Sequence, residues 1–512
     1  MNYIIIKNVN NKKRSGVLLP LFSLPGKYGI GSLGQYCKKF IDFLHESKFS
    51  YWEVLPINMT NIEGSPYNLV DAFGTNYLYI DIDELIKEGL LNSRDIKGMN
   101  FCNDARNVNY PLVFETHRKL LFKAYKRDNL KSKYFKECIN NKEIKEYAIY
   151  MTLKEKNNFK AWYDWELEDR YYCKEVEEYV LKNEEKLYLF YIWTQAKFKE
   201  QWDKIHDYAK SKNISLVGEI SHFLGYDSCQ MYMHPELFLV DKRNQITHVS
   251  GFPKDEFSNV GQKWGNPLYD WNYMKQDNYK WWNRRISEAF FYFDYVKLNH
   301  FRAFYKTYAI PFRAKNALKG EYIDGPKYDF FEDKLDQNLI SSDLGKYSED
   351  ISKFALSLPY PVCRTTILGY VSFERKEFKK FLPSSLPINS YSYLGNHDNQ
   401  PILLALKDLN EEDLLKVKEI IKEECTKLNV EFVDSTNIKY LASKTIELLF
   451  ASNANNVTLQ FQDVLFSYSE RRTNTPGTVS SLNWSHRFLS SDLVKSTVNK
   501  FIELNQKYNR SI

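Results

Sequence analysis

Short apolar runs that end in polar residues recur along this chain and predict buried parallel strands. The run at 295–298 (YVKL) ends in the polar cluster 299–302 (NHFR). The run at 214–218 ends in Glu219. Buried parallel strands have nearly continuous hydrophobic sequences, and in a parallel barrel the chemistry follows their C-terminal ends. Further strands are predicted at 16–19, 51–56, 338–341 and 390–394.

Helical periodicity dominates between several of these strands. From about residue 92 to 212, glycine nearly disappears and Leu, Lys, Glu, Tyr and Trp recur at helical spacing, which predicts a mostly helical insertion with its tryptophans in the core. The segment 251–271 is long, aromatic and loop-like, and loops of this length are typically functional lids. Other helices are predicted at 32–46 with Ser32 as the N-cap, at 272–291, and over 410–451.

The alternation of strands and helices favours an α/β barrel. Residues 1–91 would form the first part of the barrel with N-terminal loops, and residues 92–212 the helical insertion. Residues 213–512 would complete the barrel and carry the lid-like loop 251–271 at its C-terminal face.

Composition narrows the function classes. The chain has 512 residues, 43% of them hydrophobic, and 71 basic against 65 acidic residues, a balance too even to predict a nucleic-acid partner. No apolar stretch of 18 residues occurs, so no membrane span is expected. Seven widely spaced cysteines without a CxxC pair argue against a disulfide framework or a zinc site. Because the N-terminus also lacks the order of a signal peptide, a cytoplasmic protein is expected.

Nine short motifs follow one another along the chain. Single pieces such as HDN are weak signals, but GQKWGNPLYDW within the ordered set is specific. The motifs are GVLLPLFSLPGKYGIGSLG (16–34), YWEVLP (51–56), SPY (65–67), PELFLVD (235–241), GQKWGNPLYDW (261–271), HFR (300–302), SDLG (342–345), HDN (397–399) and NTPG (474–477). Their order and spacing resemble amylomaltase, the bacterial 4-α-glucanotransferase or disproportionating enzyme of glycoside hydrolase family 77, over essentially the full length.

The resemblance implies a (β/α)8 TIM barrel that transfers α-1,4-glucan segments between maltodextrins. The reaction would be a retaining double displacement that uses neither cofactor nor metal, with maltodextrin as the partner, no nucleic acid or membrane, and a monomer or homodimer as the assembly. Such a reaction needs two carboxyl groups about 5 Å apart. The lid-like loop 251–271 would exclude water, so that a sugar acceptor competes successfully.

Carried over residue by residue, the resemblance implies three catalytic positions. Asn299 stands at the nucleophile position, Ser342 at the acid/base position, and Asp398 at the position of the transition-state stabiliser. Six further residues match positions expected to bind the donor sugar or the catalytic carboxylates, and Trp264 matches an acceptor-side aromatic. The substrate-binding set is Tyr67, Asp227, Trp264, Lys297, His300, Arg302 and His397.

Two of the three catalytic carboxylates are therefore missing from the sequence. An amide is a feeble nucleophile, and a serine hydroxyl cannot protonate a leaving alkoxide near neutral pH. An active transferase would need Asp343 or Glu219 as a substitute, or residual activity through substrate assistance. Asp343 is expected to face away from the site because strand side chains alternate. Weak or absent activity is favoured. Three hypotheses stay open: an active 4-α-glucanotransferase, a non-catalytic α-glucan binder, and an interaction protein that uses the barrel as a scaffold.

Overall fold

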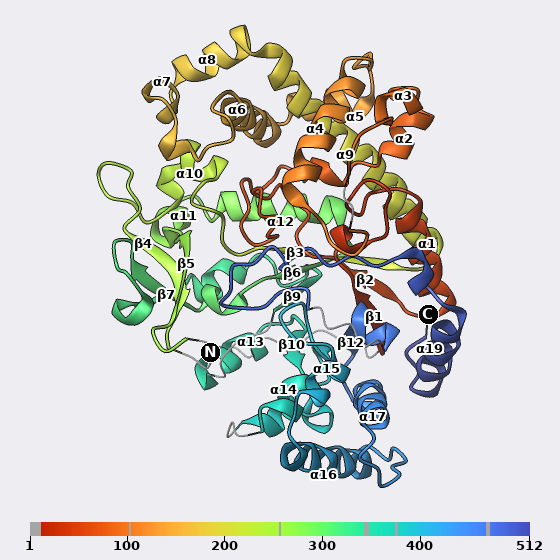
Figure 1. Cartoon of the computed structure of the whole chain (residues 1–512). Helices are drawn as coiled ribbons and strands as arrows, with labels where there is room; N and C mark the ends of the chain where they lie inside the picture. Colours follow the sequence, from red (N-terminus) through yellow and green to blue (C-terminus); the bar gives the residue numbers. More distant parts are fainter. Residues whose placement is uncertain are drawn as a thin grey trace.

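A closed barrel of eight parallel strands forms the centre of the molecule (Figure 1). The structure, a computed structural model, describes residues 12–101, 104–254, 258–342, 348–373, 377–466 and 472–511. The α/β barrel expected from the sequence is confirmed. In chain order its strands are β1 (Arg14–Leu18), β2 (Tyr51–Glu53), β3 (Ser215–Ile220), β6 (Tyr295–Leu298), β9 (Leu339–Ser341), β10 (Val362–Thr365), β11 (Ser390–Tyr393) and β12 (Asn456–Gln460).

The six strands predicted from apolar runs are present, with ends shifted by at most three residues. The strands β10 and β12 were not predicted, because each is short and contains polar residues among its apolar ones. Part of the barrel interior is filled by a small cluster of mostly aromatic side chains. Its members are Tyr51, Val217, Ile340, Cys363, Tyr391 and Tyr393, with Tyr295 packed against them.

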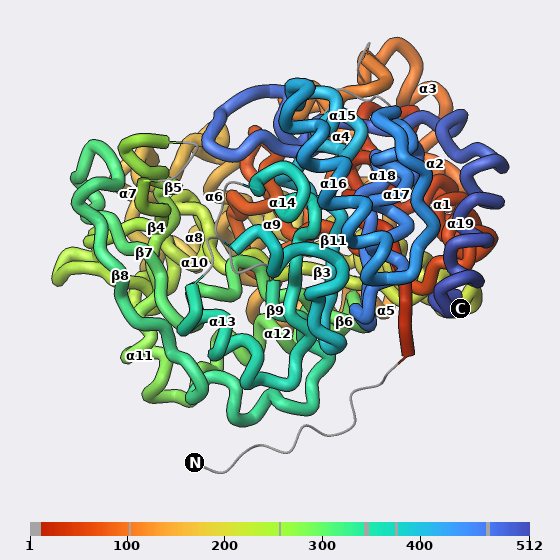
Figure 2. Tube along the Cα trace, turned by 90° about the horizontal axis from the view of Figure 1, so that it is seen from below, coloured from red at the N-terminus to blue at the C-terminus, as the bar shows by residue number. Residues whose placement is uncertain are grey.

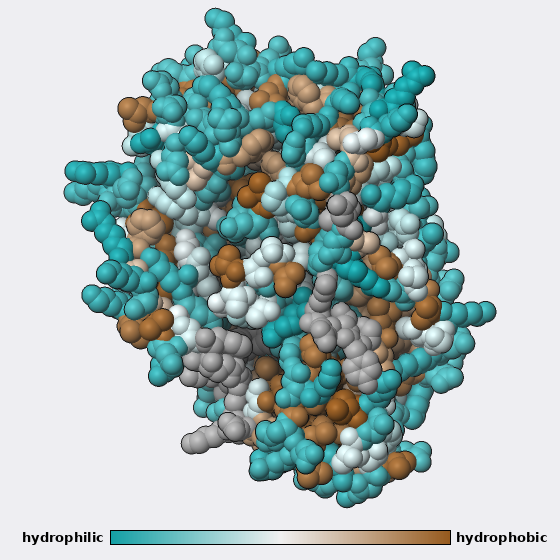
Figure 3. Space-filling view, viewed as in Figure 1, coloured by the Kyte–Doolittle hydropathy of each residue, from teal (hydrophilic) through white to brown (hydrophobic). Residues whose placement is uncertain are grey.

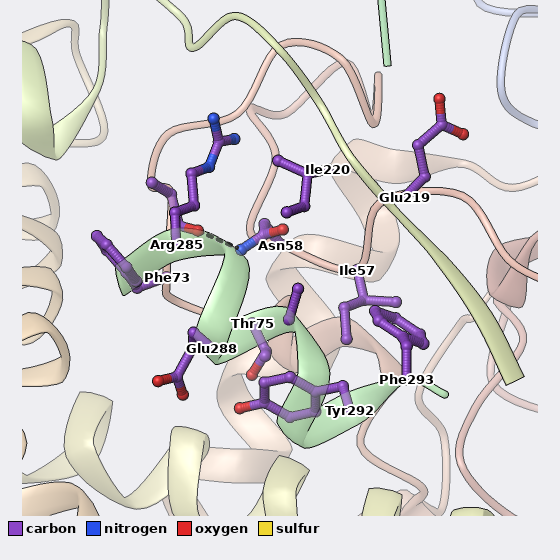
Figure 4. A pocket seen from close by; sticks show the side chains of 12 residues that line it. Ile57, Asn58, Phe73, Thr75, Glu219, Ile220, Arg285, Glu288, Tyr292 and Phe293 are labelled. Carbon is purple, nitrogen blue, oxygen red and sulfur yellow. Dashed lines mark hydrogen bonds between the residues drawn. The ribbon is translucent and has the colours of Figure 1, made fainter. Parts of the chain in front are cut away.

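Strand β3 shows why the barrel wall needs a glycine beside its polar residue. Gly218 faces the outer layer, where a Cβ would lie 2.0 Å from the ring of Phe293. The next residue, Glu219, faces the opposite side, as strand alternation requires. Figure 4 shows this alternation: Ile220 points toward the pocket between β3 and helix α12 (Lys280–Tyr292), whereas the Glu219 carboxylate points away from it.

A helical insertion follows β2 and lies to one side of the barrel, where its last helix packs against β3 (Figure 1). The predicted core position of its tryptophans is confirmed, since Trp162, Trp165, Trp193 and Trp202 are all buried. Its helices are α2 (Ile82–Lys87), α3 (Ser93–Ile96), α4 (Tyr110–Tyr125), α5 (Lys133–Asn140), α6 (Lys142–Lys156), α7 (Leu167–Arg170), α8 (Lys174–Asn183) and α9 (Glu185–Ser211).

Two parts of the segment 251–271, which is predicted to be a loop, are strands of a four-stranded antiparallel sheet, whereas residues 253–254 and 258–261 lie outside the strands. The sheet order is β5-β4-β7-β8, with β4 at His248–Phe252, β5 at Gln262–Pro267, β7 at Lys306–Pro311 and β8 at Glu321–Asp324. Glycine, proline and exposed polar residues hide the alternating pattern of β5, while pairing with β4 satisfies its backbone.

Two helix predictions need correction. Helix α1 (Gln35–Glu46) begins after Gly34, and the Ser32 hydroxyl donates to Asp81 at 2.6 Å instead of capping the helix. The predicted helix 272–291 is two helices, α11 (Trp271–Lys275) and α12, because Asn278 and Tyr279 adopt left-handed conformations. The segment 410–451, predicted to be helical, contains the two helices α16 (Glu411–Lys427) and α17 (Ile438–Ala451).

The remaining helices complete the outer layer. Helix α19 (Lys495–Lys507) packs beside α1, so the last helix of the chain closes against the first (Figure 2). Hydrophobic side chains lie in small groups among polar ones on the face seen in Figure 3. Among the described residues, no helix has both the length and the apolar character needed to cross a bilayer. The other helices are α10 (Cys229–Met233), α13 (Glu349–Leu356), α14 (Ile367–Val371), α15 (Ile402–Lys407) and α18 (Phe461–Leu465).

Candidate functional site

A buried ammonium group lies between two buried carboxylates inside the barrel. The register pairs Glu219 of β3 with Lys297 of β6. The Lys297 Nζ lies 3.0 Å from Glu219 Oε2 and 2.7 Å from Glu53 Oε1 on β2. Burial alone would lower the pKa of Lys297, but Glu219 and Glu53 together hold it above its usual value. The amine therefore stays protonated, and we call these three residues the interior array.

Asn299 follows β6 and is tied to this array. Its backbone N–H donates to the Ile220 carbonyl at 3.0 Å, and its Nδ2 donates to Glu219 Oε1 at 2.6 Å. A carboxylate only accepts hydrogen bonds, so the amide nitrogen must face Glu219 and the amide oxygen must face elsewhere. The hydroxyl of Tyr67 donates to the other oxygen of Glu219 at 3.1 Å.

His300 and Arg302 follow directly. His300 has a left-handed backbone (φ 47°), a conformation that non-glycine residues adopt mostly in turns and at functional sites. Burial and the neighbouring Arg302 lower the pKa of His300 to about 3, which keeps the imidazole neutral. The Arg302 guanidinium lies over the ring of Phe252, 5.2 Å from its centroid.

Ser342 comes directly after β9 and lies beside the end of β6. It is 5% exposed; its N–H donates to the Leu298 carbonyl at 3.3 Å, and its hydroxyl oxygen accepts from the Phe301 N–H at 3.0 Å. The hydroxyl thus helps to hold the turn that carries His300. Asp343, considered from the sequence as a replacement acid, and the rest of the SDLG motif lie outside the described residues.

Tyr67 connects the interior array to the loop after β11. Its ring stacks on His397 with centroids 5.1 Å apart, and its hydroxyl lies 3.5 Å from His397 Nδ1. His397 Nε2 lies 3.6 Å from Asp398 Oδ2. The Asn474 amide donates to Asp398 Oδ1 at 2.7 Å. A continuous chain of contacts therefore runs from Asn299 through Glu219 and Tyr67 to Asp398.

Comparisons with known proteins show which family the chain belongs to. The family profile described as 4-alpha-glucanotransferase matches residues 19–492. A 4-alpha-glucanotransferase of Streptococcus pneumoniae is 33% identical over 509 residues, which cover 98% of each chain. The Clostridium butyricum 4-alpha-glucanotransferase is 32% identical over 95% of this chain and 99% of its own length.

The chain belongs to the 4-alpha-glucanotransferase family. Its structure is also similar to the amylomaltase from Streptococcus agalactiae in complex with acarbose, with a TM-score of 0.90 and 27% identity over 98% of this chain and 100% of that one. The amylomaltase from Corynebacterium glutamicum shares the fold, with a TM-score of 0.76 and 14% identity over 97% of this chain and 74% of that one. The family and its curated relatives are transferase enzymes.

Within this member of the 4-alpha-glucanotransferase family, two of the predicted substrate-binding residues, Asp227 and Trp264, contact other parts of the protein. The Asp227 carboxylate accepts from the Tyr150 hydroxyl at 2.7 Å and the Trp162 N–H at 3.0 Å, and it pairs with Lys154. It therefore links the helical insertion to the segment after β3. Trp264 is 41% exposed on β5, and its ring meets that of His300 edge-on at 5.2 Å.

Sequence reasoning missed residues that the structure brings into the site. Glu53 is 0% exposed and accepts from the hydroxyls of Tyr391 and Tyr393 as well as from Lys297. A charged residue inside the apolar strand 51–56 was the available signal. Trp484 was also missed; its ring lies 5.4 Å from that of Tyr67.

The arrangement can bind a polyol, but its side chains offer little covalent chemistry. Asp398 has a 42% exposed side chain, His397 lies beside it, and Tyr67 stacks on His397. The described residues hold no group of three or more His, Cys, Asp and Glu side chains arranged for a metal ion.

Proposed function

We propose that this member of the 4-alpha-glucanotransferase family binds α-1,4-glucan and has transferase activity far below that of ordinary members. The substrate class is maltodextrin, and the site of action is the cytoplasm. Acarbose bound to the amylomaltase from Streptococcus agalactiae supports the choice of ligand class, since that structure has 27% identity to this chain.

The observation that carries the proposal is the hydrogen bond from Asn299 to Glu219. An amide at the nucleophile position cannot form a glycosyl ester, and here its nitrogen is also bound by a buried carboxylate. Ser342, at the acid/base position, accepts a backbone N–H instead of offering an acid. General acid–base catalysis alone contributes roughly 10²–10⁴-fold, so the loss of both groups leaves little rate.

The donor-binding side supports retained binding. His397 and Asp398 keep their side chains in one contact chain with Tyr67, and the Asn474 amide orients the Asp398 carboxylate. Burial, Glu219 and Asp398 hold the pKa of Tyr67 well above its usual value, so its hydroxyl remains a hydrogen-bond donor.

Incubation with maltotriose tests the catalytic part of the proposal. We expect almost no glucose and no longer maltodextrins under conditions in which the Streptococcus pneumoniae relative disproportionates the sugar. Disproportionation at the rate of that relative would overturn the proposal, and it would point to Glu219 as the substitute carboxylate.

Calorimetry with maltoheptaose tests the binding part. We expect saturable heat at millimolar sugar or below, and no heat with cellohexaose, whose β-1,4 linkages present a different shape. The absence of heat with maltoheptaose would refute the binding proposal and favour an interaction protein that uses the barrel as a scaffold.

A further inference from the structure

The interior array carries an unbalanced charge. Two carboxylates, Glu53 and Glu219, share one ammonium group, that of Lys297, which leaves one net negative charge in the barrel. All three side chains are at most 5% exposed, so water does little to screen this charge.

Within the described residues, the other partners of the array are neutral. Glu53 accepts from the hydroxyls of Tyr391 and Tyr393. Glu219 accepts from the hydroxyl of Tyr67 and from the amide of Asn299. The Asn299 amide therefore donates one of the hydrogen bonds that stabilise the net negative charge of the interior array.

We infer that Glu219 is a positioning residue that requires a neutral side chain at position 299. An aspartate placed there alone would stay protonated near neutral pH, and a nucleophile can be restored only when Glu219 is neutralised at the same time. The inference rests on the proposed function in one respect: it takes position 299 as the place of the nucleophile.

The physical reason is the short distance between the two side chains. A carboxylate oxygen in place of Asn299 Nδ2 would face Glu219 Oε1 across about the present 2.6 Å. Two carboxylates this close share one proton and titrate as a pair, which strongly raises one of the two pKa values. Lys297 cannot neutralise the charges of both Glu219 and an aspartate at position 299, because its single ammonium group already lies between Glu53 and Glu219. Among the described residues, the charged or titratable side chains that face the pair are Glu53 of β2, Lys297 of β6, Cys363 of β10, Tyr391 and Tyr393 of β11, and Tyr67 and His397 of the loops.

An exchange of the two side chains isolates this effect. In the double variant Asn299→Asp/Glu219→Gln, the carboxylate and the amide trade places. The number of charges in the array stays as it is now, and a carboxylate–amide hydrogen bond can form again. The single variant Asn299→Asp adds a second uncompensated negative charge instead.

Thermal unfolding between pH 4 and 9 tests the inference without any sugar. The raised pKa of an aspartate at position 299 favours the folded state at low pH, and that contribution is lost as the pH rises from about 4 through the raised value. The melting temperature of Asn299→Asp should therefore fall progressively below that of the unmodified chain as the pH rises. For the exchange variant, the difference in melting temperature from the unmodified chain should stay constant with pH. The same is expected of the control Asn244→Asp, which adds one negative charge at an exposed position. A constant offset for Asn299→Asp across the whole range would overturn the inference.

Glycosylation of the two variants by α-maltotriosyl fluoride is an independent test of the inference. A carboxylate oxygen at position 299 attacks the anomeric carbon, the C–O bond forms as the C–F bond breaks, and fluoride leaves with the electron pair, so little acid assistance is needed. At pH 6 we expect the exchange variant to release its first equivalent of fluoride at least about tenfold faster than Asn299→Asp, with the rates converging near pH 9. Equal rates at pH 6 would contradict the inference. Failure of the proposed function would appear elsewhere, as rapid disproportionation of maltotriose by the unmodified chain.

Discussion

The two sides of the barrel mouth differ in what their side chains contact. On the strand side, Glu219 accepts a hydrogen bond from Asn299, and Ser342 accepts one from the Phe301 N–H, so the proposed nucleophile and acid positions carry neutral side chains. On the loop side, Asp398 has a 42% exposed side chain that is oriented by the Asn474 amide. Under the proposed function, the residues that bind the sugar and the positions that would react with it lie on different elements, so one can be lost while the other is kept.

The sharpest test of the strand side is the removal of the Lys297 ammonium group, which pairs with both Glu53 and Glu219. Lys297→Met leaves two buried carboxylates without a counter-charge, and such losses typically cost about 3–5 kcal/mol of folding free energy. Urea denaturation followed by circular dichroism measures the change. Lys174→Met is the matched control, because Lys174 pairs with Glu178 on the surface and should contribute nothing measurable. A loss as small as that of the control would show that the array does not stabilise the fold.

Acid should destabilise the strand side through His300. Its folded-state pKa of about 3 lies below the ordinary value near 6.5, so its contribution to stability is present above pH 6.5 and is lost as the pH falls toward 3. The stability gap between the unmodified chain and His300→Gln should therefore shrink by about 1–3 kcal/mol from pH 7.5 to 4.5. Unfolding free energies at the two pH values decide this, and an unchanged gap would argue against a neutral His300 imidazole in the folded state.

The loop side should govern affinity. Asp398→Asn replaces a charged acceptor with a neutral one, and a hydrogen bond to a charged group is typically worth enough to weaken maltoheptaose binding about tenfold. Ser342→Ala changes the strand side at the acid/base position and should leave the affinity within about twofold. Calorimetry on both variants checks the contrast. Equal losses of affinity would mean that the two sides do not divide binding from chemistry.

A smaller effect is expected at the edge of the site. Trp264→Ala removes an exposed ring that can stack on a sugar, and we expect about three- to tenfold weaker maltoheptaose binding. Tyr273→Ala is the control, because Tyr273 is also 41% exposed. The same affinity for both variants would place the bound glucan away from β5.

Much of the barrel could be predicted from the sequence because its central strands are continuous apolar runs. The run at 295–298 and the run ending at Glu219 became β6 and β3 with almost the predicted ends. The sheet formed by β4, β5, β7 and β8 could not be predicted in this way, because exposed polar residues interrupt its pattern and distant segments satisfy its backbone. The prediction of one continuous helix over 272–291 was wrong for a local reason, because Asn278 and Tyr279 adopt left-handed backbone conformations.

Only part of the candidate site could be predicted from the sequence. Motif positions led to Asn299, Ser342 and Asp398, but spacing could not reveal how Glu53 and Glu219 share Lys297, since these residues meet only when the barrel closes. Spacing also could not reveal the protein contacts of Asp227, whose predicted sugar contact stays a prediction. Its carboxylate oxygens bind Tyr150, Trp162 and Lys154.

That contact of Asp227 has a consequence for local unfolding. One carboxylate joins three points of the helical insertion to the segment after β3. Opening the insertion away from the barrel must break all three interactions together, so the two segments form one cooperative opening unit. The amide hydrogens of Trp162 and of the turn after β3 should accordingly exchange with solvent at a common rate, and a glucan that slows one should slow both.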